Sequence, residues 1–143
     1  MRNTFLTLVI LCSLVSCDSV RSSLSSNLID ELSENDWILQ TLYDKDVVSD
    51  DYMKGLPELE FLEEGTVRGS TGCNSFKGTF LLKDQNLTID PGAMTKMKCP
   101  GDGEAEFLKA LNSITGVKME DEALVLMGGA EEVMKLIPQK ENK

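Results

Sequence analysis

Short apolar runs, separated at close intervals by turn residues, place the strongest limit on the fold of this chain. Turn chemistry recurs at residues 63–65, 83–86, 91–92 and 128–129. The runs between these turns are short and often alternate apolar with polar residues, which is typical of strands. The predicted strands cover residues 37–42, 58–62, 66–68, 76–82, 87–90, 117–120, 123–127 and 133–137. This pattern predicts a small domain rich in β-structure.

The first predicted strand carries the single tryptophan of the chain, Trp37. Alternation along this strand places Trp37, Leu39 and Thr41 on one face and Ile38 and Leu42 on the other. Trp37 is expected in the core, because a large aromatic side chain is usually well buried. The acidic residues 44–55 that follow show no clear period and are predicted to form a loop.

One segment departs from the strand pattern and predicts a helix. Asp102 is suited to the N-cap position, and Phe107, Leu108, Leu111 and Ile114 then repeat at helical spacing on one face. An apolar stripe of this kind packs against a sheet. Many short strands with one main helix predict an α+β fold.

The N-terminus predicts export and lipid attachment. Arg2 precedes an apolar run, and the tetrad Leu14, Val15, Ser16 and Cys17 resembles the bacterial lipoprotein signal, in which the cysteine sulfur receives a diacylglycerol. An ordinary secretory peptide is the alternative, whereas an uncleaved anchor is excluded because the apolar run is too short to span a bilayer. Cys17 is therefore the expected lipid-attachment residue, and the lipid would hold the chain on a membrane.

These features predict a single domain on a tether. The expected organisation is a signal peptide at residues 1–16, a flexible tether at 17–33, the domain at 34–138 and a tail at 139–143. Leu28, Ile29 and Leu32 have the spacing for a turn of helix within the tether. The net charge of −10, which loss of Arg2 makes one unit more negative, argues against a nucleic-acid partner.

The four cysteines predict one disulfide. Cys12 leaves with the signal peptide and Cys17 is expected to carry lipid, so Cys73 and Cys99 remain as a pair in an oxidising compartment. A bond between them closes a loop of about 25 residues, which stabilises the fold by roughly 3 kcal/mol in the chain-entropy model. Two buried thiols are the alternative.

Two short motifs add a family resemblance. Gly72, Cys73 and Asn74, followed by Phe76 and Gly78, resemble the Gly-Cys-Asn signature of the META domain family, which includes HslJ-like heat-shock-inducible lipoproteins. The second signature of that family is matched by Thr95, Met97 and Cys99. The resemblance spans residues 35–137, with departures at Lys98 and in the last strand, which lacks the usual aromatic residue.

The resemblance also implies a structure and a role. It implies a small mixed, mostly antiparallel sheet, curled toward a partly open barrel, with one main helix packed against it and the two cysteines bridged. It implies no catalytic residue, and it suggests a role in envelope integrity or stress tolerance.

Most catalytic and metal-binding arrangements are missing from the sequence. There is no histidine, which excludes Ser-His-Asp catalysis and the commonest zinc and copper ligand sets. Residues 84–90 alternate like the start of a calcium loop, but Ile89 stands where glycine is required and Thr95 where glutamate is required. A solvated hairpin is the preferred interpretation, and no metal or cofactor is expected.

Five methionines of the chain have two possible roles. They either fill the core or line an adaptable apolar groove, and core filling is preferred. The residues concerned are Met94, Met97, Met119, Met127 and Met134.

Three functions follow as hypotheses. The first is a non-enzymatic, monomeric, membrane-anchored lipoprotein of the cell envelope that binds an unidentified envelope protein. The second is a carrier or pilot module that holds an acyl chain or a peptide as its ligand. The third is a thiol enzyme that uses Cys73 or Cys99, with the thiol activated by Lys96 or Lys98.

Overall fold

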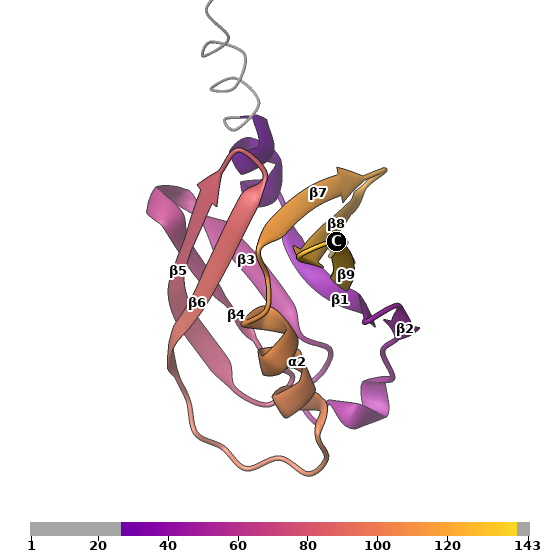
Figure 1. The fold of residues 1–143 in the computed structure, drawn as a ribbon. Helices are drawn as coiled ribbons and strands as arrows, with labels where there is room; N and C mark the ends of the chain where they lie inside the picture. The colour runs from indigo at the N-terminus through magenta and orange to yellow at the C-terminus, as the bar shows by residue number, and fades with distance from the viewer. Residues whose placement is uncertain (1–26, 140–143) are drawn as a thin grey trace, which may run out of the picture.

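In the computed structural model, which describes residues 27–139 of the 143, the strands form one sheet that curls into a half-barrel with a helix packed against it (Figure 1). The strands are β1 (Asp36–Leu42), β2 (Lys45–Asp46), β3 (Glu58–Leu62), β4 (Thr66–Ser70), β5 (Ser75–Lys83), β6 (Asn86–Met94), β7 (Gly116–Glu120), β8 (Ala123–Gly128) and β9 (Glu131–Pro138). The main helix is α2 (Gly103–Leu111), and two short 3-10 turns are η1 (Ser49–Asp51) and η2 (Glu63–Gly65). The α+β prediction is confirmed.

The strand order is β6-β5-β4-β3-β1-β9-β8-β7, with β2 paired to β1 off this path. Every strand pair in the described part of the chain is antiparallel. The two ends of the sheet approach each other, since the backbone N–H of Val117 donates to the Gln85 carbonyl at 2.9 Å and that of Leu87 to the Thr115 carbonyl at 3.3 Å. The curled, partly open barrel is the arrangement that the resemblance implied.

The helix α2 buries the predicted apolar stripe. Phe107 and Leu111 are fully buried and Ile114 is nearly so, in one cluster with the side chains of the sheet. Leu108 is only partly buried, and Ala110 completes the buried face. Asp102 occupies the N-cap position as predicted, but its side chain makes no capping hydrogen bond.

The core lies between the concave face of the sheet and the helices. Trp37 and Leu39 of β1 are 1 % exposed, and Phe61 of β3 packs edge-to-face on Phe80 of β5 with ring centroids 5.1 Å apart. The strand β1 departs from regular alternation, because its pairing with β9 shifts register between Leu39 and Thr41. Leu42 is therefore buried, whereas simple alternation placed it on the face opposite Trp37 and Leu39.

The domain begins earlier than residue 34. Residues 27–33 are helical, Leu32 is fully buried in the core, and the Trp37 indole N–H donates to the Leu32 carbonyl at 2.9 Å. The predicted turn of helix is therefore present, and the prediction of a flexible tether is wrong for residues 27–33. The predicted signal peptide, the predicted lipid-attachment residue Cys17 and the last four residues lie outside the described part of the chain. Within that part, no helix has the length and hydropathy needed to span a membrane.

The strand β6 also extends further than predicted. It continues through Pro91 and Gly92 to Met94, and its pairing with β5 shifts register between Phe76 and Lys77. Pro91 is tolerated because β6 is an edge strand. The region predicted as a loop at 44–55 contains β2 and η1.

Candidate functional site

The tight turn between β4 and β5 carries the first signature motif. Gly72 has φ +82°, in the left-handed region, and a Cβ there would overlap the ring of Tyr52. Glycine is therefore required both by the backbone and by the close approach of Tyr52. The turn places Cys73 and Asn74, each 4 % exposed, in the interior.

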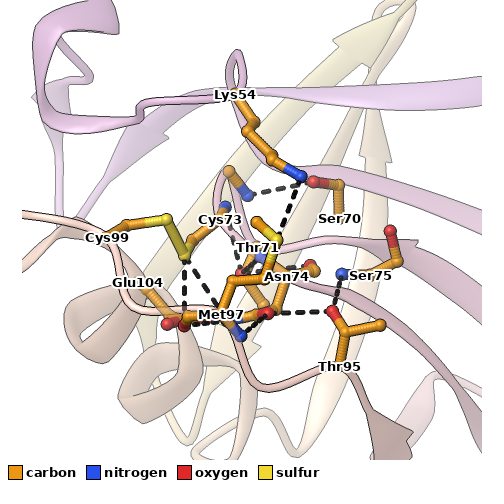
Figure 2. The surroundings of a disulfide bond; sticks show 11 residues. Lys54, Ser70, Thr71, Cys73, Asn74, Ser75, Thr95, Met97, Cys99 and Glu104 are labelled. Atoms are coloured by element: carbon orange, nitrogen blue, oxygen red, sulfur yellow. Dashed lines mark hydrogen bonds between the residues drawn. A yellow bond between two sulfur atoms is a disulfide. The ribbon is translucent and has the colours of Figure 1, made fainter.

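Asn74 uses both ends of its side-chain amide to hold the segment that contains the second signature (Figure 2). Its Oδ1 accepts from the Thr95 hydroxyl at 2.8 Å and from the Met97 backbone N–H at 2.7 Å. Its Nδ2 donates to the Met97 carbonyl at 3.1 Å and to Glu104 Oε1 at 2.9 Å. The two motifs, more than twenty residues apart in sequence, meet at this one side chain.

Thr71 completes the polar cluster. Its hydroxyl donates to Glu104 Oε1 at 2.6 Å and accepts from the Asn74 backbone N–H at 2.8 Å. Glu104 lies in the first turn of α2, where a carboxylate also interacts favourably with the helix dipole. Thr71 and Asn74 are the buried polar residues of the described chain, and both are hydrogen-bonded. The cluster thus joins the β4–β5 turn to the start of α2.

The predicted disulfide is present beside this cluster. The sulfur atoms of Cys73 and Cys99 are bonded, and the two Cα atoms lie 5.9 Å apart. Cys73 is buried and Cys99 is half-buried. Lys96 and Lys98, the residues of the thiol hypothesis, are exposed.

The remaining signature residues lie in the adjoining strand. Phe76 is 4 % exposed and belongs to the core. Gly78 has no room for a side chain, because a Cβ would overlap the carbonyl oxygen of Asp90 and lie 2.6 Å from the carbonyl carbon of Pro91. The signature therefore consists of residues that pack the β4–β5–β6 region and link it to α2.

Sequence reasoning missed three members of this site. Neither Thr71 nor Glu104 is predicted as a site residue from the sequence. Tyr52 was placed in a featureless loop, yet it is 6 % exposed and packs against Gly72 and Gly103. Tyr52 is the single aromatic residue of the predicted loop at 44–55, and this was the one available signal.

The chain matches the family model described as the META domain over residues 30–141. It belongs to the META domain family. Among curated proteins, none matches the chain. The lower bound of the match, residue 30, agrees with the early start of the packed structure.

Solved structures share the fold. A protein solved by NMR is 28 % identical, with a TM-score of 0.60, and the match covers 77 % of this chain and 93 % of that one. A DUF4847 family protein from Bacteroides vulgatus, solved by crystallography, is 16 % identical with a TM-score of 0.61, covering 80 % and 99 % of the two chains. A protein from Burkholderia xenovorans, solved by NMR, is 24 % identical with a TM-score of 0.60, covering 80 % and 88 %.

The META domain has a groove next to the signature cluster. A cavity of about 370 Å³ lies between the β1–β2 region, η1 and α2. Tyr52 lies in its wall and also lines a smaller cavity of about 90 Å³ beside the disulfide. Burial raises the pKa of the Tyr52 phenol, and the negative charges of Glu106 and Asp51 raise it further. The groove is lined by Leu42, Tyr43, Lys45, Asp46, Val47, Val48, Asp51, Tyr52, Glu106 and Lys109.

Residues 84–90, which alternate like the start of a calcium loop, lie in the β5–β6 hairpin. Asp84 has φ 58° in the β5–β6 turn, and Asp90 Oδ1 accepts from the Gly92 backbone N–H at 2.9 Å. Within residues 27–139, no group of three or more histidine, cysteine or acidic side chains is arranged to hold a metal ion.

Three of the five methionines singled out in the sequence, Met94, Met119 and Met134, contribute to the core of the domain. Met134 is fully buried, and Met94 and Met119 pack partly buried against the core. Met127 is partly buried. Met97 is 42 % exposed, and its sulfur accepts a hydrogen bond from the Lys54 ammonium at 3.5 Å. These positions favour core filling over a ligand groove lined by methionines.

Proposed function

We propose that this META-domain protein is a lipid-anchored binding module of the bacterial cell envelope that works without a catalytic step. The tetrad ending at Cys17 and the basic, apolar start of the chain support export and lipid attachment. Membership of the META domain family supports the presence of one small scaffold after this segment. The binding partner is a protein of the same compartment.

The use of the signature side chains for internal contacts carries the non-enzymatic part of this proposal. The Asn74 amide is hydrogen-bonded at both ends, the Thr71 hydroxyl donates to Glu104, and the two sulfurs are joined to each other. A catalytic nucleophile or general base needs a group that is free to reach a substrate. Because these side chains are engaged in internal hydrogen bonds and in the disulfide, they support a structural role for the signature.

Intact mass of the protein purified from membranes without reductant tests the anchor and the oxidation state together. The expected mass is that of the chain from Cys17 with acyl groups added, short of two hydrogens for the Cys73–Cys99 bond. A Cys17→Ser variant is the control and should leave the membrane fraction. An unlipidated mass for the unaltered chain would overturn the anchor.

Thiol labelling of the native protein tests the enzymatic alternative. The bonded pair should resist alkylation until the protein is reduced. Rapid labelling of Cys73 or Cys99 in the native, unreduced protein would favour a reactive thiol next to Lys96 or Lys98 and would contradict the proposed function.

A further inference from the structure

Exposed apolar side chains gather at the groove between η1 and α2. In the described residues, seven large hydrophobic side chains are exposed, and three of them fall within the eleven residues 43–53. Tyr43 is 41 % exposed, Val48 56 % and Met53 69 %. Tyr43 and Val48 line the groove, whereas Met53 lines the smaller cavity beside the disulfide, which shares Asp51 and Tyr52 with the groove. Scattered apolar residues need no explanation, but a cluster around a cavity is typical of a binding surface.

The backbone at Tyr43 supports a binding role for its side chain. Tyr43 and Asp44 have φ values of 51° and 59° in the turn between β1 and β2. Such turns favour asparagine and glycine, and a bulky aromatic residue in the left-handed region is strained. The Tyr43 ring is not buried in compensation, since it lines the groove. Strain of this kind is found more often where a side chain contacts a ligand.

The charges at the groove favour a basic partner. Asp46, Asp51 and Glu106 line it together with Lys45 and Lys109, and Asp44 and Asp50 lie immediately beside it in the chain. Acidic groups therefore outnumber basic ones here, as they do in the whole chain, which has a net charge of −10. Burial is the largest cause of the raised pKa of Tyr52, and the negative charges of Glu106 and Asp51 raise that pKa further. Such a site disfavours an anionic lipid surface or a free fatty acid.

The groove also lies away from the point where the chain enters the domain. In Figure 1 the helix at residues 27–33 lies at the top, whereas η1 and α2 lie at the bottom. A lipid attached ahead of that helix would therefore leave the groove open to other molecules of the compartment.

We propose that this groove binds a polypeptide segment of a partner protein, with apolar side chains seated against Tyr43 and Val48 and with lysine or arginine facing Asp51 and Glu106. The inference rests on the proposed function and adds a site and a partner chemistry to it. A volume of about 370 Å³ accommodates a few side chains of such a segment and lies within the range of ligand pockets.

Peptide binding to the full mature chain tests this proposal. The chain is placed in nanodiscs of zwitterionic phosphatidylcholine, and the probe is a short fluorescein-labelled peptide of leucine and lysine, with empty nanodiscs subtracted. We expect saturable binding by fluorescence anisotropy, weakened by salt. The same peptide with glutamate in place of lysine should not bind. The double variant that carries both Tyr43→Ser and Val48→Ser should bind the peptide about tenfold more weakly than the unaltered chain.

Matched variants distinguish peptide binding in the groove from a general attraction of the peptide to the acidic surface. Leu81→Ser removes a side chain that is 70 % exposed on β5 and should leave binding unchanged. Glu106→Gln should weaken binding, whereas Glu131→Gln, which removes an equal charge at the exposed start of β9, should not. Circular dichroism of each variant checks that it is folded.

Several outcomes would overturn the proposal. Equal losses from the groove variants and their controls would show general attraction of a basic peptide to an acidic protein. Binding to anionic vesicles through Val48, without any peptide, would assign the groove to a membrane, and self-association lost in the Val48→Ser variant would assign it to a second copy. A lipidated chain that fails to bind the peptide would reject the groove while leaving the proposed anchor intact.

Discussion

Asn74 shows how one buried amide can order two distant segments of a small domain. Its side chain connects the β4–β5 turn, the Met97 backbone and the first turn of α2 through Glu104. A buried polar group contributes little net energy when it is hydrogen-bonded, but it is costly when a partner is lost. Asn74 therefore stabilises the domain mainly by satisfying polar groups that would be left without a hydrogen-bond partner if its side chain were removed.

Substitution of Asn74 should destabilise the domain strongly. We expect Asn74→Ala to lower the free energy of unfolding by roughly 2–4 kcal/mol, because the Met97 backbone groups and the Thr71–Glu104 pair lose a buried partner. Urea unfolding followed by the fluorescence of Trp37, the single tryptophan, measures this change. Asn112→Ala is the control, since Asn112 is exposed and donates only to the Leu108 carbonyl. Equal losses in the two variants would contradict the role given to Asn74.

Tyr52 makes stability depend on pH in the alkaline range. Burial, then Glu106 and Asp51, raise the pKa of the folded phenol above its ordinary value of 10.0, so the unfolded chain loses this proton first. Stability from this group is complete below pH 10.0 and is lost as the pH rises toward the folded pKa. Urea unfolding between about pH 9 and pH 11 should show a steeper loss for the native chain than for Tyr52→Phe. Parallel slopes would contradict this prediction.

At the scale of elements, the β5–β6 hairpin depends on close backbone contact. Gly78 of β5 faces Asp90 and Pro91 of β6, at the part of the hairpin where β6 crosses its irregular Pro91–Gly92 segment. Added side-chain volume here meets backbone atoms, which cannot turn away as a flexible side chain would. A glycine in a strand interior is often retained for such an approach.

The substitution Gly78→Ala should therefore separate the two strands. We expect a loss of about 2 kcal/mol or more in the free energy of unfolding, since overpacking against backbone has a high cost. Gly116→Ala in β7 is the matched control, because a Cβ there lies 3.4 Å from the Gln85 carbonyl oxygen and 3.6 Å from Met127 Cβ. Differential scanning calorimetry of both variants compares them. If Gly78→Ala left the free energy of unfolding unchanged, the two strands would be able to move apart at this point without loss of stability, which would contradict the prediction.

Most elements were predictable because their signals are local. The helix α2 and the strands β3, β7, β8 and β9 follow periodicities that short segments carry by themselves. The burial of Leu42 was not predictable, because the register shift in β1 depends on its pairing with β9. The extension of β6 past Pro91 likewise depends on its position at the sheet edge, which is set by the whole topology.

The candidate site was predictable only in part, for the same reason. The paired cysteines and the signature residues could be identified from type, order and resemblance. The contact of Thr71 with Glu104 spans 33 residues and needs the fold to bring them together. The groove could not be found at all, since Tyr43, Val48 and Glu106 show no shared pattern in the sequence.

At the scale of the whole molecule, residues 27–33, the end of the segment predicted to be a tether, are part of the folded domain. Leu32 is fully buried and its carbonyl accepts from the Trp37 indole, while Leu28 packs partly buried on the core. Asn27, Leu28 and Glu31 lie near Gln85 and Val117, where the two ends of the sheet approach. The helix at 27–33 therefore lies beside the junction of the two sheet ends and packs Leu28 and Leu32 against the core.

Shortening Leu32 should then weaken the whole domain. We expect Leu32→Ala to lower the free energy of unfolding by about 2–5 kcal/mol, through lost burial and the cavity left in the core. Ile29→Ala in the same helix is the control and should cost much less, because Ile29 is 40 % exposed. Urea unfolding monitored by Trp37 fluorescence compares the two variants. A small and equal effect of both substitutions would show that the helix adds little to the stability of the domain, which would then begin at residue 34. A large loss confined to Leu32→Ala would place the start of the domain within this helix.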